Sequence, residues 1–106
     1  MPRQRDRVGW AEPALLILAS LADGPKHGYA IIKDVEEDTS IRLGPGTLYA
    51  AISRLEESGL VAALEGDERR RPYRLTTEGE TVLDDRLRAM ARFARVGLSR
   101  LGVAGA

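Results

Sequence analysis

The chain has 106 residues, and its 16 basic and 16 acidic residues cancel to a formal net charge of zero. This length supports one compact domain with a single small core. The chain has no cysteine and one histidine, His27, which excludes disulfides, cysteine-based zinc sites and a histidine metal cluster within one subunit. An enzyme would have to work with carboxylates, Lys, Ser/Thr or Tyr alone. We expect no cofactor and no enzymatic activity.

Apolar residues make up 43% of the chain, but no apolar run approaches the roughly 18 residues that a transmembrane helix needs. The stretch from Ala14 to Ala22 is interrupted by Ser20 and lacks a small-residue cleavage site. These features favour a helix of a folded domain over a signal peptide. We therefore expect a cytoplasmic protein that does not enter a membrane.

Two helices are predicted in the N-terminal part of the chain. Apolar residues recur at helical spacing from Glu12 to Ala22, and Asp23-Gly24-Pro25 ends this segment. A second helix is predicted from about His27 to Asp38. Its pattern is compatible with two buried faces, formed either by Tyr29, Ile32 and Val35 or by Ile31 and Val35.

A third helix is predicted from Pro45 to Ser58, because proline suits a first helical turn. Its expected core residues are Leu48, Ile52 and Leu55, and its expected opposite face carries Thr47, Ala50, Ala51, Ser53 and Arg54. Two helices joined by a short turn are typical of a helix-turn-helix. Residues 60–64 and 73–75 then read as two short strands around a tight loop, which predicts a wing.

A long final helix is predicted to begin at a capping box formed by Thr77 and Glu80. An apolar stripe follows at spacings of 4, 3, 4, 4 and 3 residues, and it consists of Leu83, Leu87, Met90, Ala94, Leu98 and Leu101. A domain this small has little core left to cover such a stripe. The economical partner is the same helix of a second copy, so we expect a homodimer.

The sequence thus predicts a mainly α fold with a small β-hairpin, in which a winged helix-turn-helix precedes a long C-terminal dimerisation helix. We expect an N-terminal basic arm or short helix over residues 1–11. A DNA-binding domain is expected over residues 12–76, and the dimerisation helix over residues 77–106.

Four short motifs occur in order along these elements: His27-Gly28-Tyr29, Gly46-Thr47-Leu48-Tyr49, residues 54–60 and residues 73–79. Together they resemble the PadR family of transcriptional regulators over roughly residues 13–83. The resemblance implies a repressor that binds a pseudo-palindromic operator as a homodimer and releases it on binding a small hydrophobic or aromatic effector. The chain departs from the family pattern at Gly44, where serine is frequent, and at Ala50, where proline is frequent.

The residues expected to bind DNA fall in three places. Lys26 and His27 stand at the start of the second helix, where a phosphate can meet free N–H groups. The third helix offers small and polar side chains to a major groove. The expected contacts there are Thr47, Tyr49, Ala50, Ser53 and Arg54, and those in the wing are Arg69, Arg70 and Arg71.

Two of these assignments have an alternative. His27 is equally compatible with packing against the first helix, and Tyr49 with a half-buried packing role. For a small-molecule effector, Trp10, Met90 and Phe93 are the candidate lining residues, and their alternative is the dimer core.

Two other classes of function deserve comparison with DNA binding. The neutral net charge favours a winged-helix module that docks on another protein, whereas the arginine-rich wing opposes it. A phosphate-binding enzyme built on Gly44-Pro45-Gly46-Thr47 is disfavoured, because the P-loop spacing and its lysine are missing.

Overall fold

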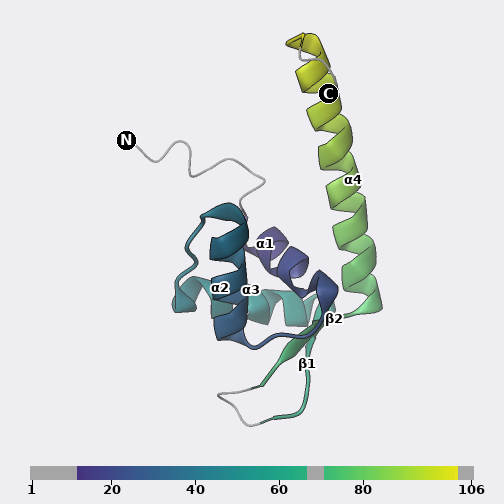
Figure 1. Cartoon of the computed structure of the whole chain (residues 1–106). Helices are drawn as coiled ribbons and strands as arrows, with labels where there is room; N and C mark the ends of the chain where they lie inside the picture. The colour runs from purple at the N-terminus through teal and green to yellow at the C-terminus, as the bar shows by residue number, and fades with distance from the viewer. Residues whose placement is uncertain (1–11, 67–70, 103–106) are drawn as a thin grey trace.

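The structure is a computed structural model that describes residues 12–66 and 71–102. Figure 1 shows its elements in chain order, and they are α1 (Pro13–Ser20), a short 3-10 turn (Leu21–Asp23), α2 (Gly28–Thr39), α3 (Pro45–Glu57), β1 (Val61–Ala63), β2 (Tyr73–Leu75) and α4 (Thr77–Arg100). The mainly helical fold with a two-stranded hairpin and a long last helix is the one predicted from the sequence.

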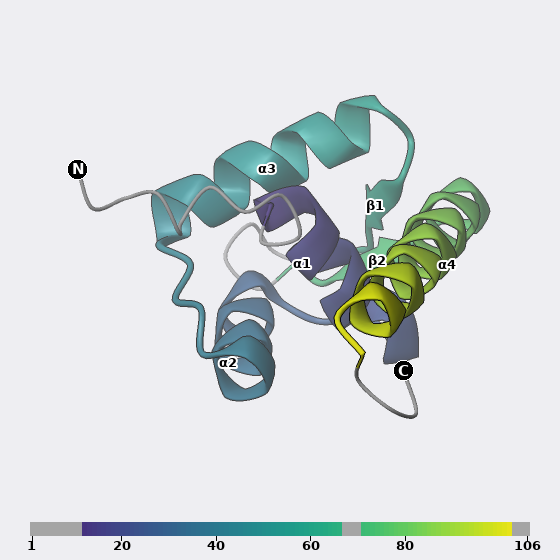
Figure 2. The same ribbon diagram turned by 90° about the horizontal axis from the view of Figure 1, so that it is seen from above.

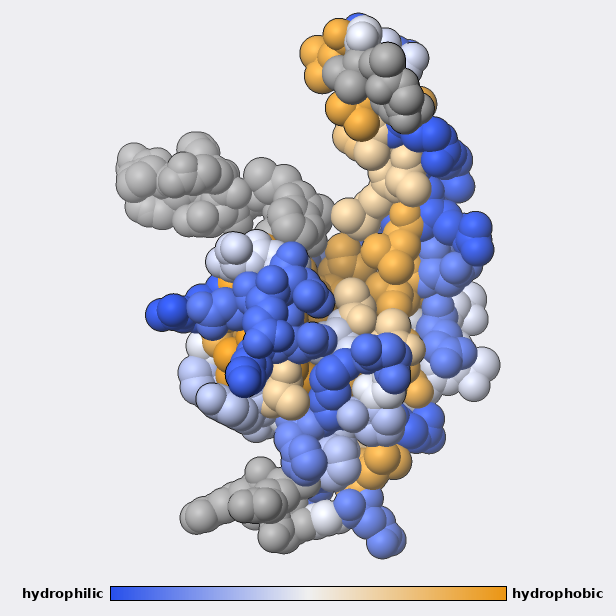
Figure 3. Space-filling view, in the orientation of Figure 1, coloured by the Kyte–Doolittle hydropathy of each residue, from blue (hydrophilic) through white to orange (hydrophobic). Residues whose placement is uncertain are grey.

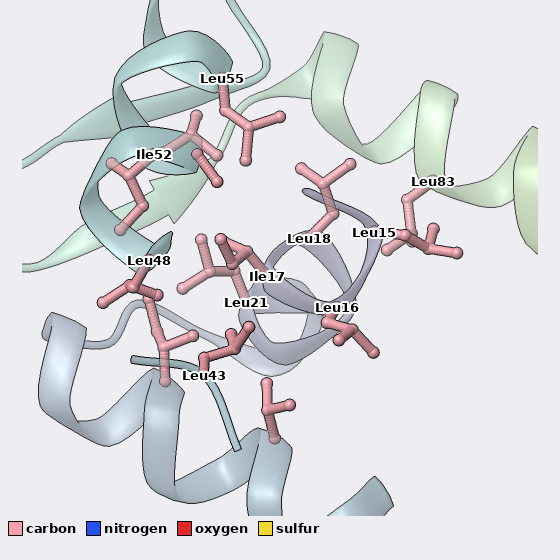
Figure 4. Close-up of a cluster of buried hydrophobic side chains, with 14 residues drawn as sticks. Leu15, Leu16, Ile17, Leu18, Leu21, Leu43, Leu48, Ile52, Leu55 and Leu83 are labelled. Atoms are coloured by element: carbon pink, nitrogen blue, oxygen red, sulfur yellow. The ribbon is translucent and has the colours of Figure 1, made fainter. Parts of the chain in front are cut away.

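Helix α1 is the centre of the core. The four consecutive residues from Leu15 to Leu18 and also Ser20 are buried, so most of the helix surface is covered and only Ala19 within this stretch is exposed. Helices α2, α3 and α4 all contact it, and Figure 2 shows them arranged around it. Its side chains point toward these neighbours in the close-up of Figure 4. A helix that is apolar all round is stable only in such a buried position.

The buried faces of α2 and α3 decide between the sequence-based alternatives. In α2, Ile31 and Val35 are buried, whereas Tyr29 is 74% exposed, so the second of the two predicted faces is correct. In α3, the prediction that Ala51 lies on the outer face is wrong, because this residue is only 3% exposed. Its small side chain belongs to the face that packs on α1.

The antiparallel hairpin pairs Val61 with Leu75 and Ala63 with Tyr73. A third segment joins this sheet through Lys26 alone. Its N–H donates to the Tyr73 carbonyl at 3.1 Å, and its carbonyl accepts from the Tyr73 N–H at 2.9 Å. The turn between α1 and α2 is thereby fixed to the base of the hairpin.

Helix α3 ends in a turn that directs the chain into the hairpin. Gly59 has φ of 78°, its N–H donates to the Glu56 carbonyl at 3.0 Å, and the Leu60 N–H donates to the Leu55 carbonyl at 2.9 Å. This pair of bonds is the Schellman motif, in which glycine accepts the left-handed conformation without strain. The motif places β1 beside the end of α3.

Helix α4 begins one residue earlier than the predicted capping box implies. Thr76 is the cap, because its Oγ1 accepts a hydrogen bond from the Gly79 N–H at 2.9 Å. The same hydroxyl donates to the Gly59 carbonyl at 2.7 Å. The predicted pairing of Thr77 with Glu80 is therefore wrong.

A Cβ at Gly79 would lie 2.1 Å from the Leu60 carbonyl oxygen, so this close contact requires glycine in the first turn.

Only the first half of α4 packs on the rest of the chain. Leu83 is buried in the core, and Met90 is partly buried against it. Arg86 adds an ion pair to Glu12 at 3.3 Å. The remainder projects away from the body, at the opposite end of the molecule from β1 and β2 (Figure 1). None of the helices within the described residues has the length and apolar character to cross a membrane.

Candidate nucleic-acid interface

The start of α2, helix α3 and the base of the hairpin meet at one place on the surface. A Cβ built on Gly28 would lie 2.2 Å from the Tyr49 hydroxyl oxygen, so the tyrosine packs directly against the first turn of α2. Tyr73 of β2 lies close enough to Tyr49, Glu56 and Arg71 for their charges to act on its phenol. Three of the predicted DNA-contacting segments are therefore neighbours.

The outer surface of α3 is a ridge of small side chains. Gly46, Ala50 and Ser53 are exposed and follow one another at spacings of four and three residues, on the opposite side from the buried Leu48. Exposed Thr47 and Arg54 lie along one side of this ridge. A helix with small residues on its outer surface can approach the floor of a groove closely, while longer side chains on the flank reach outward.

Tyr49 fits its predicted packing role in part and remains partly exposed. Its hydroxyl end packs on Gly28, as the packing alternative requires, yet the residue is still 44% exposed.

Burial raises the pKa of the neighbouring Tyr73 phenol, and the charges of Glu56 and Tyr49 raise it further. Tyr73 therefore remains a neutral hydrogen-bond donor at physiological pH.

Lys26 has a structural role that the sequence did not reveal. Its ammonium group donates to the Ser20 carbonyl oxygen and to the Asp23 carboxylate, and it lies 3.5 Å from Asp34. Burial acts to lower the pKa of Lys26, but the hydrogen bond to Asp23 and the charge of Asp34 outweigh it, so the pKa is raised. An ammonium held by two carboxylates is not free for a phosphate, and we leave Lys26 out of the interface.

The other predicted contacts divide into exposed residues and residues outside the described part of the chain. His27 is exposed and occupies the N-cap position of α2, without a capping hydrogen bond from its side chain. Arg71 is partly exposed where the chain enters β2. Arg69, Arg70 and Trp10 lie outside the described residues.

Tyr29 is the surface residue that sequence reasoning missed. One predicted pattern placed it in the core, but it is exposed and immediately follows the glycine on which Tyr49 packs. The alternative pattern, in which Ile31 and Val35 are buried, predicts that Tyr29 points outward. Tyr29 therefore adds an aromatic side chain at the start of α2.

The apolar stripe of α4 is only partly used within the chain. The prediction that Leu83 is a dimer residue is wrong for this structure, because Leu83 is 5% exposed and belongs to its own core. Farther along, Phe93 and Leu101 are 78% and 79% exposed. Leu87, Ala94 and Leu98 are exposed as well. Figure 3 shows apolar side chains along the edge of α4 that faces the body, with polar ones on its outer edge.

Helices α2 and α3 form a helix-turn-helix in which α3 has an exposed outer surface, and the hairpin of β1 and β2 follows directly. These elements define a winged helix-turn-helix DNA-binding protein. Residues 17–85 match the transcriptional regulator PadR-like family, so this chain belongs to that family. Its members are DNA-binding transcriptional regulators and not enzymes.

Known relatives agree with this assignment. The chain is 34% identical over 84 residues to the transcriptional regulator Rv3488 of Mycobacterium tuberculosis, covering 76% of this chain and 78% of that protein. It is 48% identical over 80 residues to an uncharacterized 37.1 kDa protein in transposon TN4556 of Streptomyces fradiae. That match covers 76% of this chain but 23% of the transposon protein.

The fold is also that of a solved PadR family regulator. A crystal structure from Clostridium difficile R20291 superposes with a TM-score of 0.73 at 29% identity, covering 86% of this chain and 98% of that one. The likeness extends through the C-terminal helix and is not confined to the helix-turn-helix.

Proposed function

We propose that this PadR-like regulator is a repressor that binds a pseudo-palindromic DNA operator as a homodimer. The observation that carries the proposal is the outer surface of α3, where small exposed residues form a ridge beside the start of α2 and the hairpin. No other surface of the described residues combines a projecting helix with a flanking hairpin. In this arrangement α3 enters the major groove and the hairpin flanks it.

Each contact has a chemical role in this proposal. Thr47 and Ser53 bond phosphates or base edges, and Arg54 donates to guanine or to the backbone. Tyr49 and His27 face the phosphates beside the groove. Arg71, together with Arg69 and Arg70 of the wing sequence, neutralises backbone phosphates without reading bases.

The homodimer is proposed on the exposed apolar stripe of α4. A two-fold dimer presents two α3 helices to half-sites about one turn of DNA apart, so that the symmetry of the protein appears in the operator. Phe93 and Met90 lie along this helix, and Phe93 is largely exposed. A flat aromatic effector seated beside them between two subunits would bias the spacing of the two α3 helices.

The test is selection of binding sites from random duplex DNA, followed by titration of single variants. We expect an inverted repeat and an affinity that falls with salt. Arg54→Ala is expected to cost about 1–3 kcal/mol at one position of each half-site. Arg71→Ala is expected to weaken all sequences alike and to flatten the salt dependence by about one unit per lost phosphate contact.

Arg92→Ala is the matched control, because Arg92 is an exposed arginine of α4 that follows Met90, the last residue of this helix to pack against the core. It should bind DNA like the parent protein. If selection enriches no inverted repeat and binding is insensitive to salt, the chain is instead a winged-helix module that docks on another protein.

A further inference from the structure

The carboxylates in the last turns of α2 and α3 are placed against the helix dipole, although α3 also has Arg54 in its last turn, whereas the charges at both ends of α4 follow the dipole. Helix α4 carries Glu78 and Glu80 in its first turn and Arg100 in its last, as the positive N-terminus and negative C-terminus of a helix favour. Helices α2 and α3 have no acidic residue in the first turn. Apart from Asp34 in the middle of α2, their carboxylates lie in the last turn of each helix, and they are Glu36, Glu37, Asp38, Glu56 and Glu57.

This reversal costs helix stability and is confined to the two helices of the helix-turn-helix. The first turns of α2 and α3 contain no carboxylate, and the one carboxylate beside the start of α2, Asp23, is paired with Lys26. The last turn of either helix carries at least two. The arrangement therefore separates a surface that accepts an anion from a surface that repels one.

Glu57 has a special place in this pattern because it continues the outer ridge of α3. It follows Ser53 by four residues, as Ala50 follows Gly46, and it is exposed. With a rise of 1.5 Å per residue, the ridge from Gly46 to Glu57 is about 16 Å long. The major groove is only about 12 Å wide. A helix laid flat across the groove would therefore bring Glu57 against the phosphate backbone.

We propose that Glu57 is a specificity-determining residue that repels DNA phosphates from the C-terminal end of α3. DNA is then accepted only when the helix is tilted, with Thr47, Ala50 and Ser53 in the groove and Glu57 away from the backbone. The repulsion acts mainly against non-specific complexes, which lie along the backbone, and it thereby widens the gap between operator and other DNA. This inference rests on the proposed DNA-binding function of the same surface.

The experiment compares Glu57→Gln with Asp85→Asn, each of which removes one negative charge with little change of shape. Asp85 is exposed on α4, two positions after the buried Leu83 and so on the side of that helix away from the core, and it controls for the overall charge of the protein. Affinity for the selected operator and for a scrambled duplex is measured by fluorescence anisotropy at several salt concentrations. Melting temperatures of both variants show whether folding is intact.

We expect Glu57→Gln to raise affinity for the scrambled duplex about 2.4-fold per subunit at low salt, for a charge about 8 Å from a phosphate. For the two subunits of a dimer the factor is squared, to about sixfold. Operator affinity should rise less, so the specificity ratio falls, and Glu57→Lys should extend the same trend. Asp85→Asn should leave the ratio unchanged.

Two results would overturn the inference while the parent protein still binds its operator. Equal effects of Glu57→Gln and Asp85→Asn would show that only the overall charge matters. A loss of operator affinity in Glu57→Gln would show that the carboxylate accepts a hydrogen bond from a base. If instead the parent binds neither duplex, the proposed function itself fails.

Discussion

The helix-turn-helix body buries its apolar side chains, whereas the distal half of α4 leaves them exposed. In the body, α1 is surrounded by neighbours, and residues such as Ile17, Ile31 and Leu48 are completely buried. Along distal α4, Phe93 and Leu101 are mostly exposed although they belong to an equally regular helix. Helical spacing is therefore the same in both regions, and the difference is whether the chain supplies a covering partner.

This contrast has a physical consequence. Burial of apolar surface is the main favourable contribution to folding, so the body can fold on the contacts of its own chain. The distal half of α4 gains such contacts only from another molecule. Changes in the body should therefore affect folding, and changes along distal α4 should affect association.

The largest expected effect is from Leu98→Asp, which places a charge in the apolar stripe. An unpaired charge in a buried interface costs about 3–5 kcal/mol, and a two-fold dimer would contain two of them. We expect a dimer that persists at micromolar concentration in the parent to dissociate in this variant. Light scattering and sedimentation measure the change in mass.

Ser99→Asp is the control, because Ser99 is the adjacent exposed residue and points to another side of the helix. It should keep the mass of the parent. A folded monomeric parent, or a Leu98→Asp variant with unchanged mass, would contradict the contrast between body and distal helix.

The second effect is on the core. Ile17→Ala removes three carbon atoms from a fully buried site on α1, and we expect a loss of about 2–5 kcal/mol in the free energy of unfolding. Val96→Ala removes two carbons from a half-exposed site away from the stripe, and we expect a change within about 0.5 kcal/mol. Denaturant titration of both variants measures the difference, and comparable losses would show that distal α4 is packed more tightly than its exposure indicates.

The third effect is at the joint between the two regions. Thr76→Ala removes both the cap of α4 and the hydrogen bond to the Gly59 carbonyl, so we expect it to lower the unfolding free energy by about 1–2 kcal/mol. Thr77→Ala removes an exposed residue of the first turn and should change it by less than about 0.5 kcal/mol. If thermal or chemical unfolding shows a larger loss for Thr77→Ala than for Thr76→Ala, the predicted capping box of Thr77 and Glu80 is supported instead.

The smallest effect is the pH dependence contributed by the ion pair of Asp23 and Lys26 in the body. The hydrogen bond from Lys26 and its charge lower the pKa of Asp23 below 3.8, so this stabilisation is present above pH 3.8 and is lost as the pH falls through the lowered value. The raised pKa of Lys26 has the opposite sign: its contribution is present below pH 10.5 and is lost as the pH rises beyond the raised value. Between these limits the pair should contribute a constant amount.

Asp23→Asn should therefore make thermal stability less sensitive to pH at the acid end. Near neutrality it should leave the pH dependence of thermal stability unchanged. Because Asp23 is highly exposed, the difference should be small and should shrink with added salt. An acid transition that is identical in parent and variant would show that the other carboxylates alone determine it.

Local periodicity accounts for the correctly predicted parts of the molecule. Helices α2 and α3 are predictable because their buried residues recur every three or four positions. Pro45 and Gly59 mark the ends of α3 in the sequence itself. The ridge of Gly46, Ala50 and Ser53 follows from the same spacing, since residues opposite a buried face must point outward. The sequence alone therefore determined the order of elements and, apart from Ala51, the exposed side of α3.

Contacts between distant segments decided the rest. The bridge from Lys26 to Tyr73 and the ion pair of Lys26 with Asp34 join residues whose separation leaves no periodic pattern. Ala51 is buried because α1 lies against it, and Gly79 is required because Leu60 approaches its backbone. A side chain's spacing tells which way it points, but only the packed neighbours tell whether it is covered. This is why Leu83 belongs to the core while the later residues of the same stripe remain exposed.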